Sequence, residues 1–244
     1  MNTETLEISR RFRGPARSGN GGYVCGLLGK HVPGPCAVRL KVPPPLEVEL
    51  RIEAADGEAR LFHGSTLIGE ARRIDFHLAP PTPPSFPDAE KASKFCVGLT
   101  RHSFPNCFVC GPQRLFADGM RIFPGPVEGS SMVAAPWVPD SSLVGESGSV
   151  GLEFLWAALD CPTGFSVLPV PDGKTILLGE LCVRIAGAVS PGERCVAIAW
   201  PLEVDGRKRF AGSAIFGEFG RAVAVARATW IEVPASTFAD DASN

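Results

Sequence analysis

Two stretches, SGNGGYVCGLLG at residues 18–29 and GSVGLEFLWAALD at residues 148–160, decide the fold expected of this chain. Each begins with glycines and continues in mostly apolar residues. Each therefore predicts a buried helix whose first backbone N–H groups have no intrahelical partner. The first stretch contains no acidic residue, whereas the second ends on Asp160 but lacks an Asn-Gly-Gly start. If the two helices lie side by side, they supply the two parts of one composite site.

A proline-rich segment divides the chain. Residues 79–87 contain five prolines in nine residues, a density that neither continues a helix nor suits a central strand. This segment predicts a linker over residues 79–100, between an N-terminal half at residues 1–78 and a C-terminal half at residues 101–235. Residues 236–244 are expected to form a disordered tail.

Period-2 hydrophobic patterns follow each predicted helix. In the first half they lie near residues 36–42, 46–54, 58–63 and 66–78, and in the second near residues 181–185, 194–203, 207–216 and 221–233. Two local echoes link the halves: AVRL at 37–40 with CVRI at 182–185, and GSTLIGE at 64–70 with GSAIFGE at 212–218. Strands grouped after a single helix predict an α+β fold, with a curved antiparallel sheet that packs on the helix.

Composition narrows the function classes. The chain has 244 residues, 45% of them hydrophobic, and a net charge of −2, which provides no long-range field for nucleic acid or an anionic membrane. No window approaches the roughly 18 apolar residues of a membrane helix. Residues 1–5 are polar, with no apolar signal core after them, so we expect a cytoplasmic protein. The eight scattered cysteines are then expected to be reduced thiols.

This arrangement resembles a double hotdog fold, in which a curved sheet wraps one central helix in each half. Asn20-Gly21-Gly22-Tyr23 is similar to the His-Gly-Gly helix start of phenylacetyl-CoA-type thioesterases, with Asn20 in place of the histidine. CFVCG at 107–111, followed by DGMRI at 118–122, is similar to a lead-in of many single hotdog thioesterases. WAALD at 156–160 is similar to the helix stretch that carries their acid. The resemblance covers residues 6–78 and 102–233.

The chain departs from the family pattern in an instructive way. In that pattern the acid lies eight residues after the first glycine of the pair. Eight residues after Gly21 is Gly29, which has no side chain, and eight before Asp160 is Leu152, which follows the lone Gly151. Each half keeps the part that the other lacks. The resemblance therefore implies one working site across the interface between the halves.

The resemblance implies hydrolysis of acyl-CoA thioesters. The N–H groups of Gly21 and Gly22 are the candidates for stabilising the oxyanion, and Asn20 is either the helix N-cap or a further donor to the substrate. Asp160 is the candidate general base, with a nucleophilic role as the alternative. Glu153, seven residues earlier on the same helix face, is a second acid candidate.

Candidate substrate-binding residues are Tyr23, Trp156, Glu153 and Arg17. Core packing would explain these aromatic residues equally well, as it would Phe12, Phe154 and Phe165. Four arginines flank the first helix and suit the phosphates of an acyl-CoA, although a solvated strand face is an equal alternative; they are Arg10, Arg11, Arg13 and Arg17.

A second constellation consists of Cys96, His102, Cys107 and Cys110. A Cys-x-x-Cys pair with a nearby histidine and another cysteine is a pattern that can hold zinc. The spacing is irregular and no second Cys-x-x-Cys pair follows, so inward packing of the cysteines is the alternative. The predicted site accordingly includes no metal ligand and no cofactor.

Other functions remain open from the residues alone. An acyl-CoA hydratase or dehydratase on the same fold is disfavoured because no histidine neighbours Asp160. A non-catalytic protein that binds acyl-CoA is the other alternative, since the first half has already lost its acid. The absence of Gly-x-Ser-x-Gly argues against an α/β-hydrolase. The expected partner is an acyl-CoA, and pairing of outer sheet edges leaves a homo-oligomer open.

Overall fold

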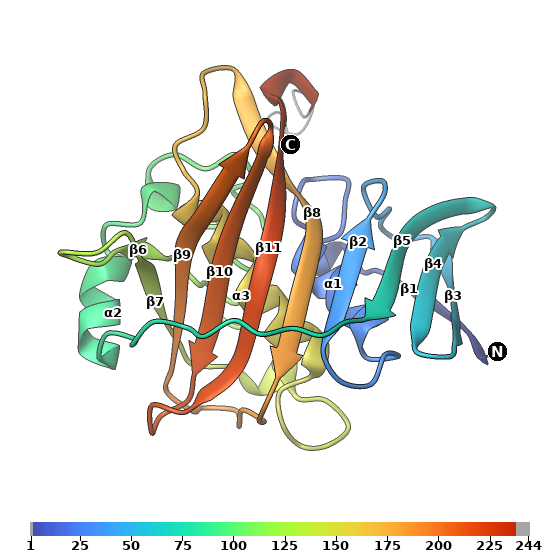
Figure 1. The fold of residues 1–244 in the computed structure, drawn as a ribbon, viewed down its shortest axis with the longest axis horizontal. Coiled ribbons are helices and arrows are strands. Elements are labelled where there is room, and N and C mark those ends of the chain that lie inside the picture. The colour runs from blue at the N-terminus through green and yellow to red at the C-terminus, as the bar shows by residue number, and fades with distance from the viewer. Residues whose placement is uncertain (1, 238–244) are drawn as a thin grey trace.

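The computed structural model describes residues 2–237, whose strands form one antiparallel sheet of eleven strands. The order across this sheet is β1-β3-β4-β5-β2-β8-β11-β10-β9-β7-β6. The strands before the predicted linker occupy one side of the sheet and those after it occupy the other (Figure 1). The predicted α+β class, with antiparallel strands grouped after each long helix, is confirmed.

Most strands after each helix lie on the predicted patterns, although the strand predicted to begin at residue 181 begins at Lys174. The first part of the chain contains β1 (Asn2–Glu7), α1 (Gly21–Gly29), β2 (Cys36–Leu40), β3 (Glu49–Ala55), β4 (Glu58–His63) and β5 (Thr66–Arg73). The second contains β6 (Gly125–Pro126), β7 (Val133–Trp137), α3 (Leu152–Ser166), β8 (Lys174–Ile185), β9 (Cys195–Asp205), β10 (Lys208–Phe216) and β11 (Ala222–Pro234). Short 3₁₀ turns occur at Arg10–Phe12, Val97–Leu99 and Ser141–Leu143.

The two sides of the sheet join where β2 pairs with β8. Ala37 lies opposite Cys182, so the first pair of echoed stretches meets at the centre of the sheet. The second echo is misleading. Residues 64–70 form a turn and the start of β5, whereas residues 212–218 end β10, which occupies the place that β4 has on the other side. Glycine, serine and apolar residues recur wherever a strand meets a turn, which explains the chance similarity.

Helices α1 and α3 lie behind the sheet in Figure 1 and cover its inner face. The main core lies between these helices and the strands, with fully buried side chains that include Leu28, Val38, Leu155, Leu181 and Ile215. The sheet therefore holds both helices against one face, which fixes where their ends lie.

Helix α3 differs from its prediction at both ends. It begins at Leu152 rather than at residue 148, and it continues through Pro162 to Ser166. Proline within a helix removes one backbone donor. Side chains supply hydrogen bonds to the carbonyls near this point, since Ser213 Oγ donates to Leu159 O at 2.8 Å and Thr163 Oγ1 donates to Asp160 O at 2.5 Å. Asp160 thus lies inside the helix rather than at its end.

The predicted linker contains a helix, α2 (Phe86–Ser93). Ser85 Oγ caps it by accepting from Asp88 N, and Pro87 lies in the first turn, where its missing N–H leaves no gap in the helix. The preceding residues, 74–85, cross the outer face of the sheet to reach α2 (Figure 1). Their apolar side chains pack there with α2 and with β9, β10 and β11 in a second core cluster.

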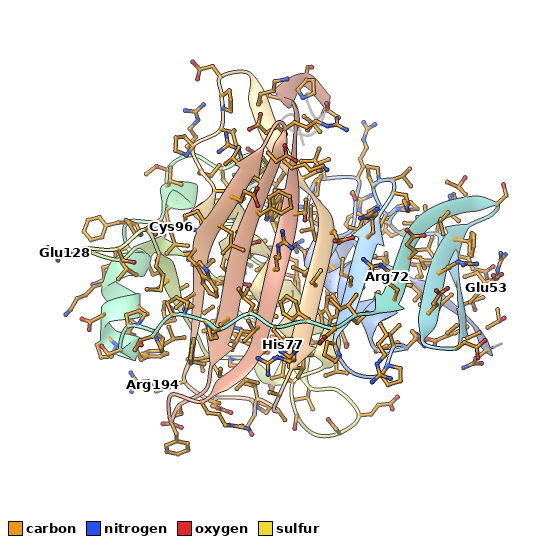
Figure 2. All side chains as sticks on the ribbon, in the orientation of Figure 1. Glu53, Arg72, His77, Cys96, Glu128 and Arg194 are labelled. Atoms are coloured by element: carbon orange, nitrogen blue, oxygen red, sulfur yellow. The ribbon has the colours of Figure 1, made fainter. Side chains whose placement is uncertain are left out.

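Side chains on this crossing segment are divided between the sheet and solvent. Phe76 is buried against the sheet, whereas His77, expected to lie in a strand, follows the end of β5 and is exposed on the outer face (Figure 2). The second core cluster buries a second face of β9 and β10, which explains why these strands are apolar on both sides.

The eight cysteines all lie within the described residues; they form no disulfide, and seven are buried. In residues 2–237, no helix combines the length and the apolar composition needed to cross a membrane. The predicted tail at residues 236–244 lies, from residue 238 onward, outside the described part of the chain.

Candidate active site

Helices α1 and α3 cross in close antiparallel contact. A methyl group on Gly22 would lie 2.4 Å from Asp160 Cβ, and one on Gly26 would lie 2.4 Å from Glu153 Cα. Only glycine at these two positions allows such an approach between the two backbones. The glycines of α1 therefore make room for α3, and this packing brings Asp160 to the first turn of α1.

Asn20 is the N-cap of α1 and is almost completely buried. Its Oδ1 accepts from the Tyr23 N–H at 2.9 Å, as expected of a capping residue. Its Nδ2 is thereby directed toward α3, where it donates to Asp160 Oδ2 at 3.3 Å. Capping thus fixes the orientation of the amide that contacts the carboxylate.

Asp160 is 2% exposed and carries two unlike carboxylate oxygens. Oδ2 accepts from the Gly22 N–H at 2.8 Å and from Asn20, whereas Oδ1 has no hydrogen-bond partner within residues 2–237. Burial raises the pKa of Asp160 to about 7, and the hydrogen bond from Gly22 opposes this rise. A buried polar atom without a partner is uncommon and marks a place where a ligand or water can bind.

A cavity of about 780 Å³ adjoins this carboxylate. Asp160, Asn20 and Gly21 line it, together with the C-terminal part of α3 and strand β8. Most of the other lining residues are apolar, and they include Phe104, Phe165, Leu168, Ile176 and Leu178. Its volume falls in the range that accommodates small-molecule ligands.

The two glycines predicted to bind the oxyanion have different surroundings. The Gly22 N–H is occupied by Asp160, and Gly22 does not line the cavity. The Gly21 N–H makes no hydrogen bond within residues 2–237, and Gly21 does line the cavity. Of the two, Gly21 is the one with a free donor at the start of the helix, where the helix dipole also favours negative charge.

All four predicted substrate-binding residues, Arg17 among them, lie outside the lining of the cavity. Tyr23 stacks on Phe12 at a ring-centroid distance of 4.3 Å within a buried aromatic group. The Trp156 ring packs against Gly29, and Glu153 lies in the first turn of α3 at the other end of the helix crossing. Core packing accounts for both aromatic residues.

Two of the four arginines that precede α1 make structural contacts. Arg11 donates to Ala117 O and Ser142 Oγ, and Arg10 pairs with Glu47. Arg17 is exposed and does not line the cavity, and neither does Arg13. The basic residues that line it are Lys41, Arg101 and Lys174. They are distant from α1 in the sequence, and no local pattern marks them.

Three cysteines gather beside Asn20. The sulfur atoms of Cys107, Cys110 and Cys161, here called the cysteine cluster, all lie within 4.8 Å of one another. Hydrogen bonds from the Cys110 and Cys161 thiols hold the pKa of Cys107 well below its usual value. Cys96 is not part of this cluster and lies beyond the end of α2 (Figure 2). No local pattern links Cys161 to this cluster, because it lies 54 residues away from Cys107.

No protein-family model and no curated protein sequence matches the chain. Several solved structures, in contrast, match the fold of the chain. A hotdog-fold protein of unknown function from Alicyclobacillus acidocaldarius superposes with a TM-score of 0.63 at 11% identity, covering 95% of this chain and 93% of that chain. The tesB protein of Mycobacterium avium subspecies paratuberculosis gives 0.61 at 12% identity, with coverage of 95% and 93%.

A candidate thioesterase II from Thermobifida fusca gives a TM-score of 0.60 at 13% identity, covering 96% of this chain and 93% of that chain. At such low identities these likenesses concern the fold alone. They span nearly the whole chain. The strand order of the sheet and the packing of α1 and α3 on one of its faces are consistent with this fold. The chain therefore has a double hotdog fold, as its sequence predicts.

Proposed function

We propose that the protein hydrolyses acyl-CoA thioesters at one composite site between α1 and α3. One observation carries this proposal. Within residues 2–237, the buried Asp160 carboxylate has Oδ2 held by α1 and Oδ1 without a partner, and it lines an apolar cavity together with Gly21, whose N–H is free. This arrangement offers a base for water and a donor for a developing oxyanion within one small volume.

In the proposed reaction, Asp160 Oδ1 accepts a proton from a water molecule whose oxygen attacks the thioester carbonyl carbon. The carbonyl oxygen becomes an oxyanion and accepts a hydrogen bond from the Gly21 N–H. When the tetrahedral intermediate breaks down, the carbon–sulfur bond is cleaved. Asp160 then returns the proton to the departing CoA thiolate. Asn20 and the Gly22 N–H hold Oδ2 throughout, so Oδ1 keeps its orientation.

Direct attack by Asp160 Oδ1 on the carbonyl carbon is the alternative mechanism. It would expel the CoA thiolate and leave a mixed anhydride, which water then hydrolyses. Solvent labelling identifies the anhydride route when water opens the anhydride at the aspartate carboxyl carbon. A single turnover in H₂¹⁸O, with protein in excess over substrate, labels the fatty acid if water attacks directly and labels Asp160 if the anhydride is opened at the carboxylate carbon.

The lining of the cavity supports an acyl-CoA as the substrate. Apolar side chains at its rim remain exposed, including Phe95 and Leu168, and suit an acyl chain or the pantetheine arm. Arg101 and Lys174 line the same cavity and are exposed, so they can reach the CoA phosphates. Two proteins of the same fold are described as a tesB protein and a candidate thioesterase II, in agreement with this proposal.

The proposal is tested with a panel of acyl-CoAs from acetyl to palmitoyl and a free-thiol readout. We expect thiol release above the spontaneous rate, with a preference for some chain lengths. If no acyl-CoA releases thiol while at least one raises the melting temperature, the protein binds acyl-CoA without hydrolysing it. If no acyl-CoA has either effect, the substrate assignment is wrong.

The contribution of the CoA phosphates is measured separately. Replacing an acyl-CoA by the acyl-pantetheine with the same chain removes the nucleotide and its phosphates. We expect a higher KM with kcat nearly unchanged, and a smaller salt dependence. Arg101→Ala with Lys174→Ala is expected to reproduce this change with acyl-CoA but to have no effect with acyl-pantetheine.

A further inference from the structure

The cysteine cluster has no role in the proposed hydrolysis, yet it is arranged more closely than core packing requires. Cys107, Cys110 and Cys161 are all buried, and their sulfur atoms all lie within 4.8 Å of one another. The distance between Cys107 Sγ and Cys161 Sγ is 3.7 Å. Two thiolates on a tetrahedral zinc ion, with Zn–S bonds of about 2.3 Å, are separated by roughly 3.8 Å.

The loop that carries two of these cysteines has a shape suited to metal binding. Cys107 and Cys110 are in the Cys-x-x-Cys spacing, and the Gly111 N–H donates to Cys107 O at 2.9 Å, which closes the turn. A methyl group on Gly111 would lie 2.5 Å from Cys107 O, so this tight turn requires glycine.

Side chains outside the cluster direct donors at the sulfur atoms. Asn20 Nδ2 lies 3.7 Å from Cys107 Sγ and 3.7 Å from Cys161 Sγ. His102 Nε2 lies 3.3 Å from Cys110 Sγ. Donors around sulfur stabilise thiolates over neutral thiols, and such outer contacts commonly support the ligands of a metal ion.

The hydrogen bonds of His102 determine whether this residue can be a metal ligand. The Phe104 N–H donates to His102 Nδ1 at 2.9 Å, so in the neutral ring the proton resides on Nε2. That proton faces Cys110 Sγ, and a nitrogen that bears a proton cannot bind a metal ion. His102 is thus a donor to the Cys110 sulfur rather than a ligand.

We propose that Cys107, Cys110 and Cys161 bind one Zn²⁺ ion through three thiolates, with the fourth position open to the cavity that all three line. Each thiol loses its proton on binding, and the ion connects the 104–111 loop to α3. Three soft sulfur ligands favour zinc over magnesium or calcium, which prefer oxygen. Asp160 is not counted among the ligands, because no oxygen of its carboxylate lies within 4.8 Å of all three sulfur atoms.

The test begins with the metal content of the full chain purified without chelator. We expect one zinc ion per chain, and we expect Cys161→Ala to lower the content at least tenfold. The matched control is Cys195→Ala, which removes an equally buried thiol outside the cluster and should leave one zinc ion per chain. Wild-type protein that stays free of zinc even after dialysis against Zn²⁺ would overturn the proposal, as would full zinc content in Cys161→Ala.

Two further measurements keep the test decisive if Cys161→Ala does not fold. Chelator-stripped wild type should gain melting temperature on addition of Zn²⁺, and Co²⁺ should produce thiolate-to-metal charge-transfer absorption typical of three sulfur ligands. His102→Ala should weaken zinc binding while the full charge-transfer intensity is kept at saturating Co²⁺; a loss of that intensity would make His102 a ligand and refute the three-thiolate site. An intact mass two hydrogens lower, with a disulfide within the cluster in freshly purified protein, would also refute it.

Discussion

The two ends of the crossing between α1 and α3 occupy equivalent positions but have opposite character. Gly21 and Leu152 are the first residues of their helices, so Gly29 and Asp160 are equivalent positions. At one end, the Asp160 carboxylate lies on the Gly22 N–H beside the cavity. At the other end, a methyl group on Gly29 would lie 2.5 Å from the Trp156 ring, which therefore covers that position.

Under the proposed function, this difference leaves a single site in a duplicated fold. The two helices pack closely at both ends of the crossing, but the residues that make the contact differ. One end buries a carboxylate that is held by backbone and amide donors, and the other buries an indole against glycine. Packing is preserved at both ends, whereas the buried carboxylate beside the cavity lies at the Asp160 end.

The largest expected effect comes from Asp160→Asn. The amide is nearly isosteric, and its oxygen can still accept from the Gly22 N–H, so we expect the fold to persist. The amide cannot accept a proton from water, so kcat should fall by about 10²- to 10⁴-fold. The measurement is thiol release from the best acyl-CoA, with circular dichroism as the check on folding.

Glu153→Gln is the matched control, because it makes the same chemical change on the same helix at the opposite end of the crossing. Glu153 is half-buried and does not line the cavity. We expect turnover to change by no more than roughly twofold. Equal losses in both variants would mean that the two ends do not differ in function, and full activity in Asp160→Asn would remove the carboxylate from the mechanism.

A second comparison pairs Gly22→Ala with Gly29→Ala. The added methyl groups would lie 2.4 Å from Asp160 Cβ and 2.5 Å from the Trp156 ring, respectively. Each should lower the free energy of unfolding by about 1–3 kcal/mol through overpacking. Only Gly22→Ala displaces the carboxylate, so we expect its kcat to fall roughly 100-fold, while Gly29→Ala keeps most of its activity.

Urea unfolding and thiol release on the same preparations test this pair. The comparison fails if Gly29→Ala loses as much activity as Gly22→Ala at similar stability. Such a result would mean that the spacing of the helices as a whole, rather than the contact at Asp160, governs turnover.

The meeting of Asn20, Gly22 and Asp160 could be predicted because each signal is local. An Asn-Gly-Gly start marks a capped helix, an apolar stretch that ends in an acid marks its counterpart, and the repeat predicts that the two pack together. Strand positions were also accessible from period-2 patterns. The sequence predicts a linker where α2 lies, because the prolines before Ser85 argue against a helix. Ser85 directly follows them and caps α2.

The rest of the site depends on contacts that sequence patterns do not encode. The choice between Gly21 and Gly22 as the free donor follows from where Asp160 Oδ2 lies, which requires coordinates. Cys161 lies beside Cys107 on a helix that continues through Pro162, against the usual preference of proline. The cations of the cavity come from separate loops and strands, so no single window of the sequence contains them.

Asn20→Ser tests the orienting amide with a smaller expected effect. Serine retains a capping oxygen for the Tyr23 N–H, so the stability of α1 should change by less than about 1 kcal/mol. The donor to Asp160 Oδ2 is lost, and we expect kcat to fall roughly tenfold with KM nearly constant. Asn20→Asp keeps the cap but adds a second carboxylate, and should be less active than Asn20→Ser. The reverse order would assign Asn20 to capping alone.

The smallest effect is expected from Tyr23→Phe. The sequence makes Tyr23 a candidate substrate contact, but its ring lies among Phe12, Phe108 and Phe154, outside the lining of the cavity. Removing the hydroxyl keeps this packing, so KM and kcat should each change by no more than roughly twofold. Steady-state kinetics across the acyl-CoA panel make the measurement. A severalfold rise in KM that depends on chain length would place Tyr23 beside the acyl chain. The substrate site at the Asp160 end of the helix crossing would then include the aromatic group around Tyr23.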